Sequence, residues 1–182
     1  MKSPAKKNSQ DFTILGIDPG SIFCGYGVIK SNGRDAEYIA SGRIAPPAAK
    51  PLHLRLRLIH EALTEIVSSY QPTDIVVEKI FFAKSAKAAL HLGHARGVVL
   101  LAAAIGEITL HERSALEVKK AIVGYGRAEK SQVQEMVKMI LKIRGTLYPD
   151  SADALALALC YMNTLQFNNA VKLQNNLITG NL

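Results

Sequence analysis

Three apolar segments of this chain carry carboxylates at their ends, where such groups are candidates for chemistry. One run ends in Asp18 and a second ends in Glu78, while Asp150 and Asp153 come directly before a third. Short apolar runs bounded by turn signals are typical of buried strands, so Asp18 and Glu78 are expected at strand ends. The spacing of three places Asp150 and Asp153 on one helix face, within the first turn.

Four such acids indicate a site for hard divalent cations. Mg²⁺ prefers oxygen ligands, and two ions about 4 Å apart can stabilise both the attacking and the leaving oxygens of a phosphodiester. Two of the acids also have an ordinary explanation when they are taken alone. Asp18 could start a turn with Pro19 and Gly20, and Asp150 could cap a helix. The occurrence of three such carboxylate positions together favours the metal site.

Length and composition predict one compact domain. The chain has 182 residues, of which 48% are hydrophobic, and it contains no run of about 20 uncharged apolar residues that could span a membrane. Residues 1–11 are basic and polar without an apolar core, so we expect a polar extension and not a signal peptide. Cys24 and Cys160 lack metal-ligand spacing and are expected to be reduced thiols of a cytoplasmic protein.

The charge of the chain is the more informative part of its composition. Lys and Arg number 22 and Asp and Glu number 15, which gives a net charge of +7. A basic protein with acids at the ends of its apolar segments suggests a polyanionic partner held around an anionic, metal-loaded centre.

The predicted elements alternate between strands and helices. Segment 52–70 is locally ambiguous, because its first leucines alternate as in a strand while its later apolar residues keep helical spacing. Its length favours a helix, which Pro72 would end. We expect a polar extension at 1–11, a single folded domain at 12–166 and a mobile, Asn-rich tail at 167–182. The expected strands are 12–17, 25–30, 38–44, 75–78 and 108–111, and the expected helices are 52–70, 85–106, one from 115, one from 128, and 150–165.

Two segments carry candidates for contact with nucleic acid. Phe81 follows Glu78 closely and could stack on an unpaired base, whereas Phe82 fits a core position better. Lys84 and Lys87 would lie on one side of the following helix, where they could contact phosphate.

The second segment, 124–131, superficially resembles a phosphate-binding loop. It has Glu129 where that loop needs glycine, and a helix where it needs a strand, so we reject nucleotide hydrolysis there. A glycine-hinged loop that presents Arg127 and Lys130 to a DNA backbone, with Lys119 nearby, is one interpretation. A solvated run of charges is the other.

Taken in order, these motifs resemble the RuvC family of Holliday junction resolvases. The resemblance covers residues 14–159, with a longer N-terminal extension than usual and with Cys24 in place of a common threonine. The motifs that carry it are Leu15-Gly-Ile-Asp-Pro-Gly-Ser, Gly25-Tyr-Gly-Val, Val77-Glu-Lys-Ile-Phe, Leu92-Gly-His-Ala-Arg-Gly, Val118-Lys, Val123-Gly, Ala128-Glu-Lys-Ser-Gln-Val and Ala152-Asp-Ala-Leu-Ala.

The resemblance implies an α/β, RNase H-like fold, with a five-stranded mixed sheet and helices on both faces. It implies a crossover junction endodeoxyribonuclease of the bacterial cytoplasm that nicks opposed strands of a four-way junction, in recombination and repair. The implied cofactor is Mg²⁺, two ions per subunit with Mn²⁺ as a substitute, and the implied partners are a second copy of the chain and the RuvA–RuvB branch-migration complex. The implied site residues are Asp18, Glu78, Asp150 and Asp153 for metal, Phe81 for base stacking, and Lys119 and Lys130 for phosphate.

The residues predict how such a site would work. Four acids without metal repel one another, so some of their pKa values should rise. Hydrolysis at phosphorus would leave a 5′-phosphate and a 3′-hydroxyl. The small residues of helix 85–106, among them Gly93 and Gly97, could let a second copy approach closely, or could pack on the protein's own sheet. A non-catalytic junction-binding protein and an actin-like or sugar-kinase-like ATPase domain are the competing hypotheses.

Overall fold

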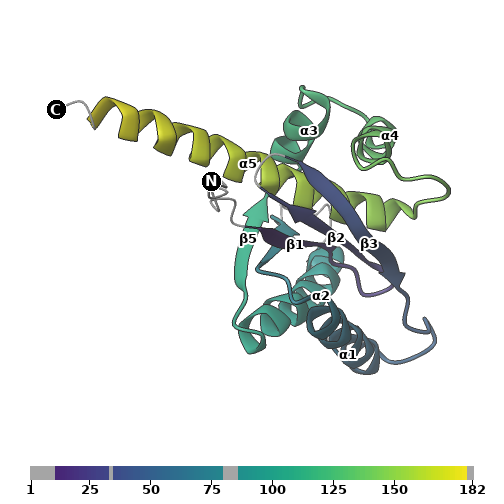
Figure 1. Ribbon diagram of the computed structural model, residues 1–182. Coiled ribbons are helices and arrows are strands. Elements are labelled where there is room, and N and C mark those ends of the chain that lie inside the picture. Colours follow the sequence, from purple (N-terminus) through teal and green to yellow (C-terminus); the bar gives the residue numbers. More distant parts are fainter. Residues whose placement is uncertain (1–10, 33–34, 80–85, 180–182) are drawn as a thin grey trace.

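The computed structural model describes residues 11–32, 35–79 and 86–179, without the side chains of 86–88, 169–170 and 172–179. Five strands form one mixed sheet with helices on both faces (Figure 1). This confirms the predicted fold class. The strands are β1 (Phe12–Asp18), β2 (Cys24–Ser31), β3 (Ala36–Ile44), β4 (Asp74–Glu78) and β5 (Thr109–Arg113), and the helices are α1 (Leu52–Tyr70), α2 (Ala86–Ile105), α3 (Ala115–Val123), α4 (Lys130–Ile140) and α5 (Pro149–Thr179).

The order of the strands is β3-β2-β1-β4-β5. The first three strands form an antiparallel meander, whereas β4 runs parallel to β1 and β5 runs parallel to β4. Parallel neighbours end at the same edge of a sheet, so Asp18 at the end of β1 and Glu78 at the end of β4 emerge at one edge.

Helices α1 and α2 cover one face of the sheet (Figure 1). The ambiguous segment is the helix α1, whose buried residues Ile59, Leu63 and Ile66 follow helical spacing. The helix ends where Gln71 adopts a left-handed conformation with φ 45°, directly before Pro72. The alternation of the first leucines therefore does not mark a strand. In the described part of the chain, none of the helices is both long and apolar enough to pass through a membrane.

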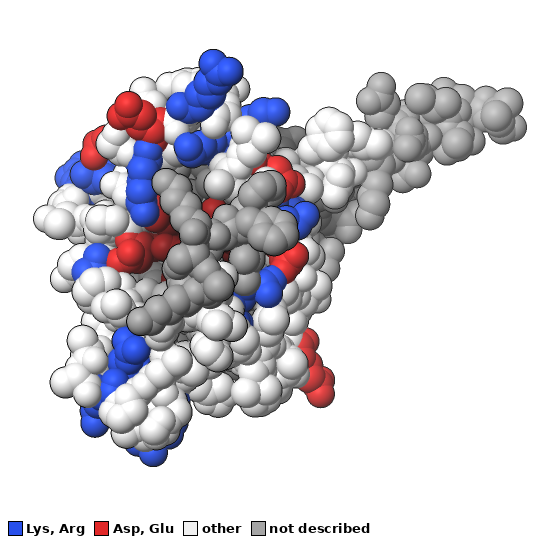
Figure 2. All heavy atoms as spheres, turned by 180° about the vertical axis from the view of Figure 1, so that it is seen from behind, with Lys and Arg blue, Asp and Glu red and all other residues white. Residues whose placement is uncertain are grey.

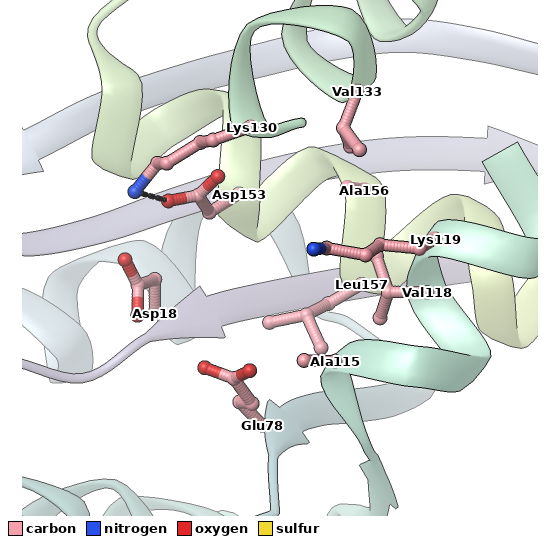
Figure 3. A pocket seen from close by; sticks show the side chains of 10 residues that line it. All are labelled: Asp18, Glu78, Ala115, Val118, Lys119, Lys130, Val133, Asp153, Ala156 and Leu157. Carbon is pink, nitrogen blue, oxygen red and sulfur yellow. Dashed lines mark ion pairs between the residues drawn. The ribbon is translucent and has the colours of Figure 1, made fainter. Parts of the chain in front are cut away.

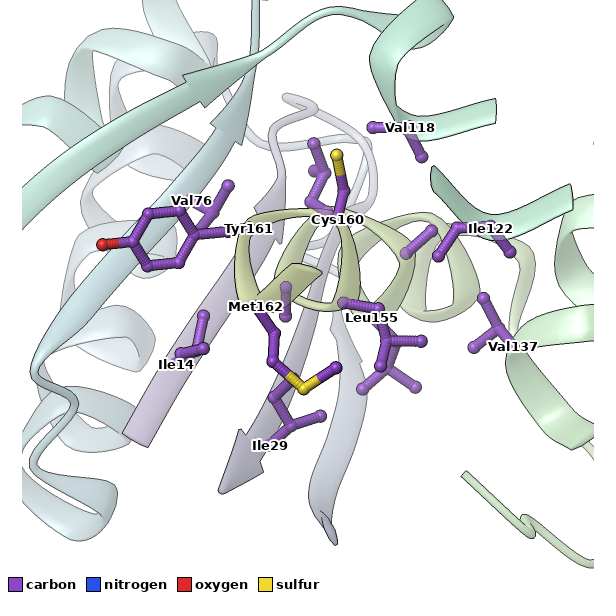
Figure 4. Packing of buried hydrophobic residues seen from close by; sticks show 14 of the residues in the cluster. Ile14, Ile29, Val76, Val118, Ile122, Val137, Leu155, Cys160, Tyr161 and Met162 are labelled. Carbon is purple, nitrogen blue, oxygen red and sulfur yellow. The ribbon is translucent and has the colours of Figure 1, made fainter. Parts of the chain in front are cut away.

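Helix α5 lies on the other face and is flanked by α3 and α4 (Figure 1). Ile14, Ile29 and Val76 of the sheet pack against Leu155 of this helix, as Figure 4 shows from close by. All four side chains are fully buried. Each such burial stabilises the fold by about 1.5–3 kcal/mol.

Glycines in β1 and β2 let α5 lie against the bare backbone of the sheet. A Cβ atom on Gly16 would overlap the carbonyl group of Ala154, and one on Gly25 would overlap the carbonyl group of Asp150. Gly16 pairs with Gly27 across the two strands, so the small positions are adjacent. The N-terminal half of α5 is therefore closer to the sheet than side chains would permit.

Several element boundaries differ from the prediction, among them those of α4, β5 and α5. Helix α4 begins at Lys130 and not at residue 128, because Glu129 has extended backbone and caps the helix together with Gln132. Strand β5 is 109–113, not 108–111. Helix α5 continues to Thr179, because neither proline nor glycine interrupts it before Gly180. The expected end at 165 is wrong, the mobility of the tail stays a prediction, and residues 1–10 lie outside the described residues.

The contact of Gly16 with α5 can be tested by substitution. We expect Gly16→Ala to lower the free energy of unfolding by about 3 kcal/mol or more, because the new methyl group meets helix backbone, which cannot rotate away. Gly93→Ala is the matched control, since nothing lies within 4 Å of its added Cβ and alanine favours a helix. Urea denaturation measures both variants. Equal stabilities would contradict the close approach.

Candidate active site

The alternation of side chains along two strands aims Asp18 and Glu78 at α5. Ile14 and Val76 belong to the core beneath this helix. Asp18 is four residues after Ile14, and Glu78 is two residues after Val76, so each acid faces the same side as its apolar partner. The apolar residues thus bury the strands, and the acids emerge where the strands end.

Helix α5 adds a third carboxylate. Asp18, Glu78 and Asp153 line one pocket, and Figure 3 shows their side chains facing it from β1, β4 and α5. Lys119 of α3 and Lys130 of α4 complete its charged lining. The remaining lining residues are small or apolar, namely Ala115, Val118, Val133, Ala156 and Leu157. Two strands from the first half of the chain and three consecutive helices from the second half therefore converge on a pocket lined by acids.

Burial and mutual repulsion perturb these acids. Burial, together with the charges of Asp153 and Glu78, raises the pKa of Asp18 from 3.8 to about 7, although the charge of Lys130 opposes this shift. Burial and the charge of Asp153 raise the pKa of Glu78. Burial also raises the pKa of Asp153, although its bond to Lys130 opposes the shift. The pocket therefore has an excess of negative charge that its own lysines only partly offset.

Lys130 lies at the rim of the pocket, where its Nζ forms an ion pair with Asp153 (Figure 3). Its side chain is 62% exposed. Burial alone would lower its pKa, but the bond to Asp153 and the charge of Asp18 outweigh this effect and raise it. The cation is therefore next to the acids and still accessible to a ligand.

The fourth predicted acid, Asp150, lies beside the pocket and not among its lining residues. Its Oδ2 atom is 2.7 Å from Nη2 of Arg43 on β3. Sequence reasoning did not single out Arg43, because no motif surrounds it. The register between β2 and β3 brings Arg43 to Asp150, because Arg43 pairs with Gly25 and the backbone of Asp150 lies directly over Gly25.

The predicted DNA contacts are only partly described. Lys119 is half-buried in the pocket wall, and Arg127 is exposed between α3 and α4. Phe81 and Lys84 lie outside the described residues, as does the side chain of Lys87. Their roles stay predictions. On the face shown in Figure 2, acidic side chains lie among basic ones, with several Lys and Arg residues gathered toward the top and the bottom.

A second cavity adjoins the same acids. It shares Asp18 and Glu78 with the first pocket and is also lined by Lys79, Arg96 and Leu116. Arg96 forms an ion pair with Glu112 of β5. The two carboxylates thus stand between two hollows, an arrangement that gives an extended ligand room on either side of them.

The donor atoms suit a hard divalent cation. Carboxylate oxygens are the ligands that Mg²⁺ prefers, and the raised pKa values show charge that a cation would offset. Within residues 11–32, 35–79 and 86–179, no three Asp, Glu, His or Cys side chains are placed to bind one ion together. The fit therefore rests on the chemistry and the shared pocket of the acids.

Comparisons with known proteins agree with this geometry. The family model for the crossover junction endodeoxyribonuclease RuvC matches residues 14–161. The RuvC protein of Shewanella loihica is 46% identical over 84% of this chain and 88% of its own length, and that of Saccharophagus degradans is 46% identical over 83% and 87%. A solved structure of T. thermophilus RuvC in complex with a Holliday junction substrate superposes with a TM-score of 0.81, at 30% identity over 86% of this chain and 96% of that chain.

The raised pKa of Asp18 predicts how stability depends on pH. Between pH 3.8 and about 7 the folded state keeps a proton that the unfolded state has lost, so without metal the stability should fall as pH rises through this window. The change should be on the order of a few kcal/mol. Asp18→Asn should flatten this dependence and stabilise the protein at pH 8.

Urea denaturation in EDTA at pH 5, 6.5 and 8 measures the effect. Glu61→Gln, which alters an exposed acid on α1, should keep the slope of the unchanged protein. A slope that persists in Asp18→Asn would show that other groups cause it.

Proposed function

The chain belongs to the RuvC family of crossover junction endodeoxyribonucleases, and we propose that it resolves four-way DNA junctions with the acid pocket described above. The family is one of metal-dependent nucleases, and its T. thermophilus member is solved with a Holliday junction substrate. One observation carries the proposal for this chain. Carboxylates from β1, β4 and α5 share a pocket with two lysines.

The acids would hold the metal. Asp18, Glu78 and Asp153 would bind from inside the pocket, and Asp150 from its rim. Two Mg²⁺ ions, or Mn²⁺ in their place, supply an activated water and stabilise the leaving oxygen when they are bound. The chain's own role is to fix these carboxylates on elements that packing holds still. The products would carry a 5′-phosphate and a 3′-hydroxyl.

Basic residues around the acids would hold the DNA. Lys119 and Lys130 line the pocket and would contact phosphates next to the scissile bond, and Arg127 would contact the backbone farther away. Lys130 would exchange its partner Asp153 for phosphate when the acids hold metal. Phe81, from the family resemblance, and Lys84 and Lys87, from their helical spacing, remain proposed contacts, and Phe81 would stack on an unpaired base.

The exposed face of α2 supports a homodimer. Leu90, Leu101 and Ile105 are 63%, 53% and 65% exposed, and helical spacing places them with Gly97 on one side of the helix. Among the described residues, an added Cβ on Gly97 would meet no heavy atom within 4 Å apart from the backbone of its own helical turn, so the helix has room for a close neighbour there. A two-fold dimer would match the two-fold symmetry of an open junction.

We also propose, from family membership, that the protein works in the cytoplasm together with the RuvA–RuvB complex. A junction-binding protein without catalytic activity would have no need of three half-buried carboxylates with raised pKa values. No described feature favours the ATPase alternative.

The role of Asp18 separates catalysis from binding. We expect Asp18→Asn to lower the nicking rate of a synthetic four-way junction in Mg²⁺ by at least 100-fold, because one anionic metal ligand is lost. Junction affinity should be kept or improved, since an acid facing phosphate is neutralised. Gel assays of cleavage and of binding measure both, with Glu61→Gln as the unaffected control. If Asp18→Asn nicked junctions at a near-normal rate, Asp18 would serve only to form the turn after β1, and its role as a metal ligand would be wrong.

The dimer can be tested on α2. Leu101→Glu should give monomers by analytical ultracentrifugation, at concentrations where the unchanged protein is dimeric, because a charge would be buried at the interface. It should also lose the paired nicks. Met139→Glu is the matched control, since Met139 is 66% exposed on α4. A Leu101→Glu protein that stays dimeric and nicks both strands would rule out this interface.

A further inference from the structure

Arg43 and Asp150 form an ion pair at the edge of the acid pocket. Nη2 of Arg43 is 2.7 Å from Oδ2 of Asp150, and the two side chains are 22% and 23% exposed. Arg43 stands near the end of β3, in register with Gly25 of β2, which in turn pairs with Asp18 of β1. The guanidinium is therefore two strands away from the central acid of the site.

Two aromatic rings hold the guanidinium in place. Its central carbon is 4.3 Å from the ring centroid of Phe23 and 4.5 Å from that of Tyr148. Both rings are themselves partly exposed, so this contact does not bury the cation in the core. Cation–π contacts of this kind orient an arginine without using its hydrogen-bond donors.

The ion pair itself lacks directional hydrogen bonds. Nε of Arg43 and Oδ2 of Asp150 are both buried, and among the described residues neither has a hydrogen-bond partner of good geometry. Charge and stacking therefore hold the two groups together. A cation that binds Asp150 would have to overcome the attraction between Arg43 and Asp150. It would not have to break an aligned, bidentate hydrogen bond between them.

The four predicted metal-binding acids divide into two pairs. Asp150 and Asp153 each have an internal cation, Arg43 and Lys130 respectively. Asp18 and Glu78 form no ion pair in the described part of the chain. Both cations pair with acids of α5. Lys130 lies at the rim of the pocket, and Arg43 lies beside the pocket. Arg43 thus does for Asp150 what Lys130 does for Asp153.

We propose that Arg43 is an internal counter-ion that competes with divalent cations for Asp150 and so sets the Mg²⁺ concentration at which the site fills. The inference rests on the proposed function, in which Asp150 is one of the metal-binding acids. Arg43 acts through Asp150 and is a positioning residue. The opposite effect would follow if Arg43 served to orient Asp150 for the metal, so the sign of the change in affinity decides between the two.

The expected size follows from Coulomb's law. A single positive charge about 6 Å from a divalent cation in a water-like dielectric opposes binding by roughly tenfold in affinity. Removing the charge of Arg43 should therefore tighten Mg²⁺ binding by about 3- to 10-fold. Removing an arginine far from the acids should leave the affinity unchanged.

Isothermal titration of the full-length protein with MgCl₂ measures this affinity directly. The variants are Arg43→Met and Arg43→Gln, of which the second keeps polar character if the first folds poorly. Arg57→Met is the matched control, because Arg57 pairs with Glu61 on the exposed side of α1. In junction nicking, the half-saturating Mg²⁺ concentration should fall for both Arg43 variants.

The outcomes separate this inference from the function on which it rests. Tighter Mg²⁺ binding by both Arg43 variants, with Arg57→Met unchanged, supports the counter-ion. Unchanged or weaker Mg²⁺ binding by the Arg43 variants overturns the counter-ion inference. If Asp150→Asn binds Mg²⁺ more weakly in the same series, the proposed function remains intact. Binding by Asp150→Asn at the affinity of the unchanged protein would instead overturn the assignment of Asp150, and the inference with it.

Discussion

The contact of α5 with the bare backbone of β1 and β2 is the constraint on which the site depends. Gly16 and Gly27 leave no side chain between the helix and the sheet, and Gly25 accommodates the backbone of Asp150 itself. A helix held farther away by ordinary side chains would carry Asp153 out of the pocket that it shares with Asp18. The close packing that stabilises the fold therefore also sets the distance between acids on separate elements.

This packing brings together charges that oppose it. The pKa of Asp18 rises to about 7 because the carboxylate is largely shielded from solvent and lies near Asp153, Glu78 and Asp150. The repulsion between acids is confined to the edge of the sheet, because the preceding residues on the same face of these strands are fully buried apolar side chains. Strained or repulsive groups persist where the surrounding structure determines their positions, and they are found at functional sites. Lys130 and Arg43 reduce the repulsion at the rim.

The sequence predicted the elements well where one periodicity dominates. The apolar runs before Asp18 and Glu78 located two strand ends, and the spacing of Asp150 and Asp153 located one helix face. It could not predict that Arg43 meets Asp150, because this contact depends on the β2–β3 register, which includes an irregularity between Val28 and Ile29. The end of α5 was missed for a different reason. Asparagines lower helix propensity without stopping a helix, and no glycine or proline follows until residue 180.

The two sides of α2 bear on how catalysis and the proposed dimer would coexist. Leu92 and Arg96 of this helix line the cavity next to Asp18, whereas Leu90 and Leu101 project from the opposite side and are exposed. The acid pocket lies between the ends of β1 and β4 and the helices α3, α4 and α5, which cover the other face of the sheet (Figure 1). A second copy bound to the exposed side of α2 would therefore leave both acid pockets open. Each pocket could then receive one strand of the junction, which is what two symmetric nicks require.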